Sequence, residues 1–356
     1  MRFDRFILVL LFASSPAFAG IVDDVRVALA QNSFTAAESA LNAYRAQRGV
    51  TPEYLEGLSW MARAALDDQH YSQAEHYAKQ THALAVQQLK SRKLDAEPHL
   101  PIAFGAALEV EAQTLAAQGK KAQGVALLRS ALVTYGSTSI AARLHKNLNL
   151  LSFVGRPAPA LKTAEYLGMP LASLAQLKGS PVLLFFWAHW CMDCKGEAPI
   201  LARLRSEFKD LTIVAPTQRY GYAARGEDAT AAAELAYINA VWQQYYPGLQ
   251  GVGVPVSHEN FNVYGASTTP TLVLVDRTGK IAFYHPGALP YPDLRAAIEK
   301  VMKGEVPGRS TSRPAGSGFD SAGQATTPDR PQSCFGRPAL PSASSRGRPK
   351  PPHASG

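Results

Sequence analysis

The fold of the C-terminal half of this 356-residue chain is decided by one stretch, Phe185-Phe186-Trp187-Ala188-His189-Trp190-Cys191-Met192-Asp193-Cys194-Lys195-Gly196-Glu197-Ala198-Pro199. It begins inside a nearly continuous apolar run at 181–188, which is typical of a strand buried on both faces. A helix is predicted from Cys191 to about residue 209. The stretch therefore predicts a buried strand that leads into a helix with two thiols in its first turn.

The two thiols are separated by two residues, a spacing at which the sulfurs can form a disulfide without unwinding the helix. Cys191 faces the positive end of the helix dipole, which stabilises its thiolate and makes it the expected nucleophile. Cys194 is expected to resolve the mixed disulfide that results. The pair predicts a redox-active disulfide.

Other uses of a Cys-x-x-Cys pair fit less well. Haem attachment requires a following His, and Lys195 stands there. A zinc site needs two more ligands, and no second Cys pair or spaced His pair accompanies this one, so no metal and no cofactor is predicted. A purely structural disulfide across so small a loop gains little chain entropy. We interpret His189 as an exposed position beside Trp190 rather than as a ligand or a base.

The region downstream alternates strands with helices and predicts an α/β sandwich. Strands are expected at 211–215, 271–276 and 280–284, and helices at 228–246 and 291–302. An unusually long segment at 218–253 is rich in aromatic residues, namely Tyr220, Tyr222, Tyr237, Trp242, Tyr245 and Tyr246. These side chains either form a partner-binding face or pack locally, and we expect packing.

Five motifs resemble those of the TlpA/ResA-like periplasmic thiol-disulfide oxidoreductases, which have the thioredoxin fold. They are the stretch from Trp187 to Cys194, the entry motifs Gly155-Arg156-Pro157-Ala158-Pro159 and Leu174-x-x-Leu177-x-Gly179, the pair Glu197 and Pro199, and the segment Tyr264-Gly265-Ala266-Ser267-Thr268-Thr269-Pro270-Thr271. The resemblance covers about 153–303 and does not extend to the rest of the chain.

The resemblance implies roles for six residues. The catalytic set would be Cys191, Cys194, Glu197 and Pro270, and the substrate would contact Trp190 and the backbone of Thr269. Pro270 would follow a cis peptide bond and sit against the sulfurs. Glu197 would handle a proton near Cys194, unless it is an ordinary exposed helix carboxylate.

The resemblance also implies a reductase of protein disulfides that draws electrons from a membrane thiol relay. Asp193 favours the same direction, because an acid between the thiols disfavours the thiolate. One departure is Phe185, which stands where thioredoxin itself carries a buried Asp.

Residues 1–19 predict a cleavable signal peptide. Two arginines precede a short apolar run, and Ala17-Phe18-Ala19 matches the small-x-small cleavage pattern. The expected location is therefore the periplasm, and an uncleaved segment anchored to the inner membrane is the alternative.

Residues 20–152 predict an all-α domain, with helices at 23–31, 35–48, 52–66, 72–90, 102–118, 122–135 and 139–150. Small residues recur at Ala37, Ala74 and Gly124, as in degenerate tetratricopeptide repeats, but a plain bundle is equally compatible. Its aromatic residues, Tyr44, Trp60, Tyr71 and Tyr77, are expected to pack between helices rather than line a peptide groove.

The tail at 304–356 is about half Pro, Gly and Ser, a composition that predicts disorder. It contributes +4 of the chain's net charge of +8 and contains Cys334. Because its basic residues are not gathered on a folded face, no nucleic-acid partner is predicted.

Two functions are compatible with this organisation. The first is a periplasmic thiol-disulfide oxidoreductase whose helical domain recruits a periplasmic partner. The alternative is a helical protein-binding scaffold whose thioredoxin-like domain serves as a regulatory, oxidase or isomerase module.

Overall fold

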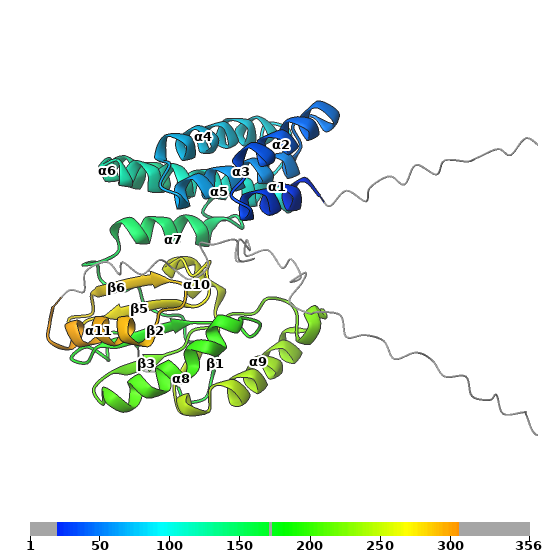
Figure 1. The fold of residues 1–356 in the computed structure, drawn as a ribbon. Coiled ribbons are helices and arrows are strands. Elements are labelled where there is room, and N and C mark those ends of the chain that lie inside the picture. Colours follow the sequence, from blue (N-terminus) through cyan, green and yellow to red (C-terminus); the bar gives the residue numbers. More distant parts are fainter. Residues whose placement is uncertain (1–19, 171–172, 306–356) are drawn as a thin grey trace, which may run out of the picture.

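The computed structural model describes residues 20–170 and 173–305, in which a helical half is stacked on a half built around a β-sheet (Figure 1). The predicted signal peptide and nearly all of the predicted tail, including Cys334, lie outside the described residues. No helix in the two described ranges combines the length and the apolar character needed to cross a bilayer.

The helical half consists of α1 (Ile21–Ala30), α2 (Phe34–Arg48), α3 (Pro52–Asp67), α4 (Tyr71–Gln88), the 3₁₀ turn η1 (Leu94–Ala96), α5 (His99–Ala117), α6 (Lys121–Tyr135) and α7 (Ala141–Ser152). Each predicted helix is present, with ends displaced by a few residues. Local signals account for several starts: Ser33 caps α2, and Thr51 caps α3 with Pro52 in the first turn.

Small residues allow these helices to approach closely. Ala37 and Ala74 are fully buried, and a Cβ on Gly124 would lie 2.7 Å from the carbonyl oxygen of Ala112 on the neighbouring helix. Trp60 and Tyr77 are also buried, which confirms that these two aromatic side chains pack between helices.

The sheet half consists of β1 (Tyr166–Leu167), β2 (Val182–Phe186), α8 (Met192–Glu207), β3 (Thr212–Val214), η2 (Ala224–Gly226), α9 (Ala231–Tyr245), η3 (Pro247–Leu249), β4 (Val254–Pro255), α10 (His258–Tyr264), β5 (Thr271–Val275), β6 (Ile281–Pro286) and α11 (Tyr291–Met302). The sequence predicted the main strands and the helices α8, α9 and α11. It did not predict β1, β4 and α10, which are short.

The central sheet has the strand order β3-β2-β5-β6, with β2 parallel to β3 and antiparallel to β5. Side chains of β2 alternate between two cores. Leu183 and Phe185 pack with α8, α9 and α11, whereas Leu184 and Phe186 pack with α10 on the opposite face. A strand buried on both faces at the centre of an α/β sandwich is therefore confirmed.

Helix α7 belongs to both halves. On one side it packs against α5 and α6, and on the other against α10 and β6, as its position in Figure 1 shows. Asn149 donates a hydrogen bond to the carbonyl oxygen of Tyr264 at 2.9 Å. Gly265 has φ +64°, and a Cβ there would lie 2.2 Å from the backbone nitrogen of Lys146. The predicted division between 152 and 153 thus falls at the end of a helix that both halves share.

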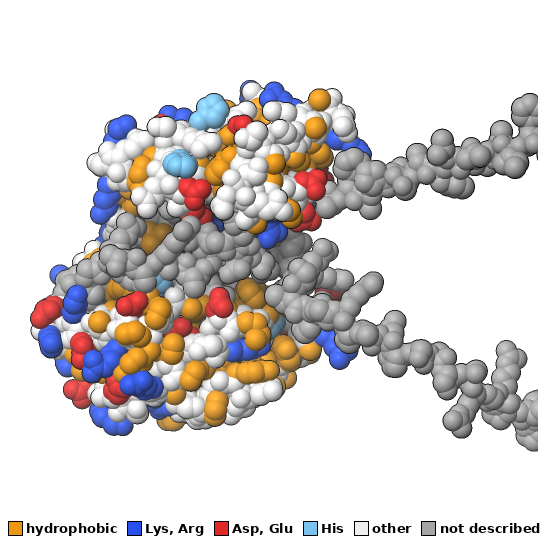
Figure 2. Space-filling model, in the orientation of Figure 1, with side chains coloured by type: hydrophobic (Ala, Val, Ile, Leu, Met, Phe, Trp, Pro, Cys, Tyr) orange, Lys and Arg blue, Asp and Glu red, His pale blue; other side chains and the backbone are white. Residues whose placement is uncertain are grey.

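The outer surface of the sheet half carries mixed charge. Figure 2 shows Lys and Arg side chains interspersed with Asp and Glu where α8 and α11 lie in Figure 1. Glu207 pairs there with Arg203 at 2.8 Å and with Arg295 at 3.1 Å. Positive and negative side chains alternate there, so this face does not form the basic patch that a nucleic-acid site needs.

Candidate active site

The two cysteines form a disulfide at the start of α8. Cys191 is the N-cap residue, and its sulfur accepts a hydrogen bond from the backbone N–H of Cys194 at 3.1 Å. The Cα atoms are 5.3 Å apart. Cys191 is 4% exposed and Cys194 is fully buried. The sulfur nearer to solvent is therefore the one that the helix N-terminus stabilises.

The segment before β5 faces this sulfur. The Thr269–Pro270 peptide bond is cis, and the carbonyl oxygen of Thr269 lies 3.4 Å from Cys191 Sγ. Ser267, Thr268 and Thr269 are half-buried, so this segment lies at the surface of the site. The structure thus brings Cys191, Thr269 and Pro270 together, although 78 residues separate Cys191 from Thr269 along the chain.

Glu197 is buried one turn further along α8. It is 2% exposed, so the interpretation as an ordinary exposed helix carboxylate is wrong. Burial raises the pKa of its carboxyl to about 7. The negative charge of Asp193 also raises this pKa, whereas a backbone hydrogen bond from Leu289 lowers it. Its Oε1 atom has no hydrogen-bond partner among the described residues. A carboxyl group with a pKa near neutrality can accept and release a proton under ordinary conditions.

Two tryptophans lie in the loop between β2 and α8. Trp187 is fully buried and donates from its indole N–H to the carbonyl oxygen of Ala215 at 3.1 Å. Trp190 is half-buried, and its ring packs edge-on against Tyr220 with a centroid separation of 5.5 Å. Trp187 therefore anchors the loop, while Trp190 stands next to Cys191 at the edge of the core.

The expectation for His189 is wrong. Its side chain is 1% exposed, and Nε2 lies 3.4 Å from Oε1 of Glu234 on α9. The exposed interpretation failed because the segment 218–253 folds back over the loop and covers this position. The sequence offered one signal, an unusually long aromatic segment, but nothing in it linked Glu234 to His189.

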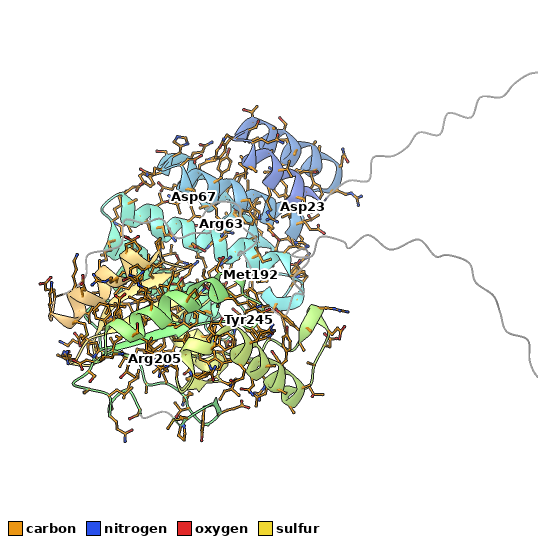
Figure 3. The ribbon with its side chains drawn as sticks, turned by 60° about the horizontal axis from the view of Figure 1, so that its bottom comes forward. Asp23, Arg63, Asp67, Met192, Arg205 and Tyr245 are labelled. Atoms are coloured by element: carbon orange, nitrogen blue, oxygen red, sulfur yellow. A yellow bond between two sulfur atoms is a disulfide. The ribbon has the colours of Figure 1, made fainter. Side chains whose placement is uncertain are left out.

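The aromatic residues of 218–253 divide into two sets. Trp242 and Tyr246 are buried and stack on each other at 4.6 Å beside Trp187, which confirms local packing. Tyr245 is 41% exposed, and Lys195 Nζ lies 4.5 Å from the centre of its ring. Figure 3 labels Tyr245 on α9 and Met192 at the start of α8, and Met192 is 66% exposed between the two cysteines. The exposed side chain of Met192 thus provides an apolar surface between the two cysteines.

A cavity of about 590 Å³ lies away from this site, towards the C-terminal end of α8. Arg205 lines it and hydrogen-bonds the carbonyl oxygens of Gly248 and Gln250. The described residues contain no cluster of three His, Cys, Asp or Glu side chains suited to a metal ion.

Known proteins share the sheet half of this chain. Residues 172–302 match the family of the thioredoxin-like domain. The thiol-disulfide oxidoreductase ResA of Bacillus thuringiensis (strain Al Hakam) is 27% identical over 149 residues, which are 42% of this chain and 78% of that protein. The thiol:disulfide interchange protein DsbE of Pseudomonas fluorescens biotype C is 29% identical over 137 residues, which are 38% of this chain and 68% of that protein.

Among solved structures, the exposed lipoprotein thioredoxin of Streptococcus pneumoniae strain TIGR4 is 24% identical, with a TM-score of 0.30, covering 37% of this chain and 90% of that one. The sheet half is a thioredoxin-like domain, and its sequence relatives are thiol-disulfide oxidoreductases. The resemblance to that class is thereby confirmed.

Proposed function

We propose that this chain is an extracytoplasmic thiol-disulfide oxidoreductase that reduces protein disulfides. The observation that carries the proposal is the position of Cys191 Sγ, which is held at the N-terminus of α8 and lies 3.4 Å from the carbonyl oxygen that precedes cis-Pro270. A sulfur in this place has a stabilised thiolate and an adjacent backbone edge on which an extended peptide can pair.

In the first step, the Cys191 thiolate of the reduced protein attacks one sulfur of a substrate disulfide. A new S–S bond joins Cys191 to the substrate, and the other substrate sulfur leaves as a thiolate that takes a proton. Trp190 and the backbone of Thr269 are proposed to contact the substrate, because both border Cys191.

In the second step, Cys194 loses its proton and attacks Cys191 Sγ. The Cys191–Cys194 disulfide forms, the mixed disulfide breaks, and the second substrate sulfur leaves as a thiol, so two electrons pass to the substrate. Glu197 is proposed to accept the Cys194 proton, since burial brings its pKa to about 7. A second dithiol protein, proposed to be a membrane thiol relay, then reduces the disulfide.

Three observations support the location and the direction. The sequence of 1–19 has the features of a signal peptide, and the relatives include a ResA and a DsbE protein. Asp193 is exposed between the thiols and disfavours the thiolate, which favours a reducing couple.

The first test is trapping. A Cys194→Ala variant retains the nucleophile but lacks the resolving thiol, so it should accumulate mixed disulfides that reductant releases. A Cys191→Ala variant is the matched control and should trap none. Equal trapping by both variants would overturn the assignment of nucleophile and resolver.

The second test measures direction. Equilibration with glutathione should place the couple nearer to thioredoxin, at about −270 mV, than to the oxidant DsbA, at about −120 mV. A reduction potential above about −180 mV would contradict the reductase and favour an oxidase or an isomerase.

A further inference from the structure

His189 is an unusual residue to find inside the core next to a redox disulfide. It is 1% exposed, and neither ring nitrogen makes a hydrogen bond within the described residues. The rings of Tyr220, Tyr222 and Tyr237 surround it edge-on at centroid separations of 5.3 to 5.5 Å. Leaving a buried donor or acceptor unpaired costs about 1–3 kcal/mol. A buried side chain with this cost calls for an explanation other than filling space.

Glu234 provides the polar neighbour. It is 1% exposed in the first turn of α9, and its carboxylate accepts hydrogen bonds from the backbone N–H groups of Tyr220 and Gly221. The same Oε1 atom lies 3.4 Å from His189 Nε2. Glu234 therefore fixes the start of the segment 218–253 and points to the loop that carries Cys191.

The charged and titratable groups near His189 come from three elements. They are Glu234 on α9, Lys195 on α8, and the tyrosines already named. Burial, together with the charge of Lys195, lowers the pKa of His189 to about 4. The imidazole is thus neutral at neutral pH, and Nε2 is the ring nitrogen that faces the Glu234 carboxylate.

Contacts extend from this pair to the reactive sulfur. Tyr220 touches His189 on one side and Trp190 on the other. Trp190 directly precedes Cys191, and the Cys191 backbone N–H bonds to the carbonyl oxygen of Ala188. His189 is therefore connected to Cys191 by the backbone of Trp190 and by Tyr220, whose ring contacts both His189 and Trp190.

We propose that His189 and Glu234 are positioning residues for Cys191: they hold the loop 187–191 against the segment 218–253 and so keep the Cys191 sulfur at the N-terminus of α8, facing Thr269. The proposal deepens the proposed function and rests on the same site. It also gives the long segment 218–253 a role in exchange besides packing.

Two substitutions at His189 separate positioning from packing. His189→Leu has a similar volume and suits an apolar pocket, but it has no donor. His189→Gln keeps an N–H at about the reach of Nε2. The readout is the rate of Cys191 alkylation by iodoacetamide in the reduced full-length protein from pH 5 to 9, with the site located by peptide mapping because Cys334 is also a thiol.

If the pair positions Cys191, His189→Leu lowers the alkylation rate about tenfold while the protein stays folded, which its melting temperature shows. His189→Gln restores the alkylation rate to within about threefold of the wild-type rate, because its side chain keeps an N–H group. A packing role predicts the reverse order, with Leu equal to the wild type and Gln impaired, and that result would overturn the proposal.

A double-mutant cycle completes the test. Glu234→Ala should lower the rate by a similar factor, and adding His189→Leu should lower it little further, because the two residues act as a unit. Glu227→Gln, which removes an exposed carboxylate from the same segment, is the control and should have no effect. Fully additive losses would contradict the pairing.

Alkylation needs no protein partner, so this test remains decisive even if the chain proves inactive in disulfide exchange. Absence of mixed disulfides in the trapping experiment would contradict the proposed function alone. Unchanged alkylation in His189→Leu would contradict the positioning role alone.

Discussion

Each half of the molecule buries a glutamate, and the two are held in opposite ways. Glu109 in the helical half lies 2.9 Å from Lys146 and 3.5 Å from Arg143. Burial alone would raise its pKa, but the charges of Lys146, Arg143 and Arg63 outweigh burial and lower it to about 2. Glu197 in the sheet half forms no ion pair with any residue that the structure describes, and burial raises its pKa to about 7.

This difference in pKa distinguishes a carboxylate that stabilises the fold from one that is suited to proton transfer. A buried carboxylate that is paired with cations keeps its charge at every ordinary pH and so serves packing between helices. A buried carboxyl without a cationic partner changes its protonation state near neutral pH and is suited to proton transfer. The Glu109 cluster also links α5 to α7, the helix on which the sheet half rests.

The largest expected effect comes from breaking the paired site. Glu109→Gln leaves Lys146 and Arg143 buried without a counter-charge, so we expect the free energy of unfolding to fall by about 3–5 kcal/mol. Urea denaturation followed by circular dichroism measures the loss. Asp68→Asn, on an exposed carboxylate of the same half, is the control and should change stability by less than about 0.5 kcal/mol. A similar small change in Glu109→Gln would show that the cluster does not stabilise the fold.

The contact between the halves is tested at Gly265. Gly265→Ala places a methyl group against the backbone of His145 and Lys146 at a positive φ, where neither side can give way easily. Left-handed strain and overpacking together predict a loss of about 3 kcal/mol. Gly196→Ala, at a position with open space around it, is the matched control. If Gly265→Ala melts like the wild type, α7 does not pack here as described.

The pH dependence of stability should differ in sign between the two glutamates. Glu197 has a folded pKa of about 7, above its usual value, so the neutral form stabilises the fold and this stability is lost as the pH rises from about 4.5 through 7. From pH 5 to 8 the loss should reach about 2–3 kcal/mol. Glu109 has a lowered pKa, so its contribution is present above about pH 4.5 and disappears as the pH falls towards 2.

Glu197→Gln should abolish the alkaline part of this dependence in the oxidised protein, while the wild type retains it. The same variant should flatten the pH profile of disulfide exchange near pH 7, since the proton acceptor is lost and the helix is kept. Identical stability curves for variant and wild type between pH 5 and 8 would mean that Glu197 ionises in the fold as it does in water.

The smallest effect concerns an exposed carboxylate. Asp193→His removes an acid from between the thiols, and a change of one thiol pKa unit corresponds to about 30 mV in a two-electron couple. We expect the potential to rise by tens of millivolts, measured against glutathione. A fall in potential would contradict the role given to Asp193.

Much of the fold follows from local pattern. Helix periodicity predicted all seven α-helices described in the first half, and the apolar run at 181–188 predicted a strand buried on both faces. The short elements β1, β4 and α10 escaped because two to seven residues carry too little periodicity to be distinguished from loops.

The sequence predicted some residues of the candidate site correctly and one of them wrongly. Spacing alone marked Cys191 and Cys194, because disulfide chemistry needs two thiols within one helical turn. The cis bond before Pro270 was expected from a resemblance and is present. The burial of His189 was missed, since it depends on α9 folding over a loop more than forty residues earlier in the chain.

The sequence by itself therefore determined the order of the elements and the reactive pair, because both are set by residues within a few positions of each other. Only the tertiary structure decided that Glu197 is buried and forms no ion pair among the described residues, that His189 lies beside Glu234, and that α7 packs against both halves. Burial and partner charges arise from segments distant in sequence, and these two quantities set the pKa of a carboxyl group.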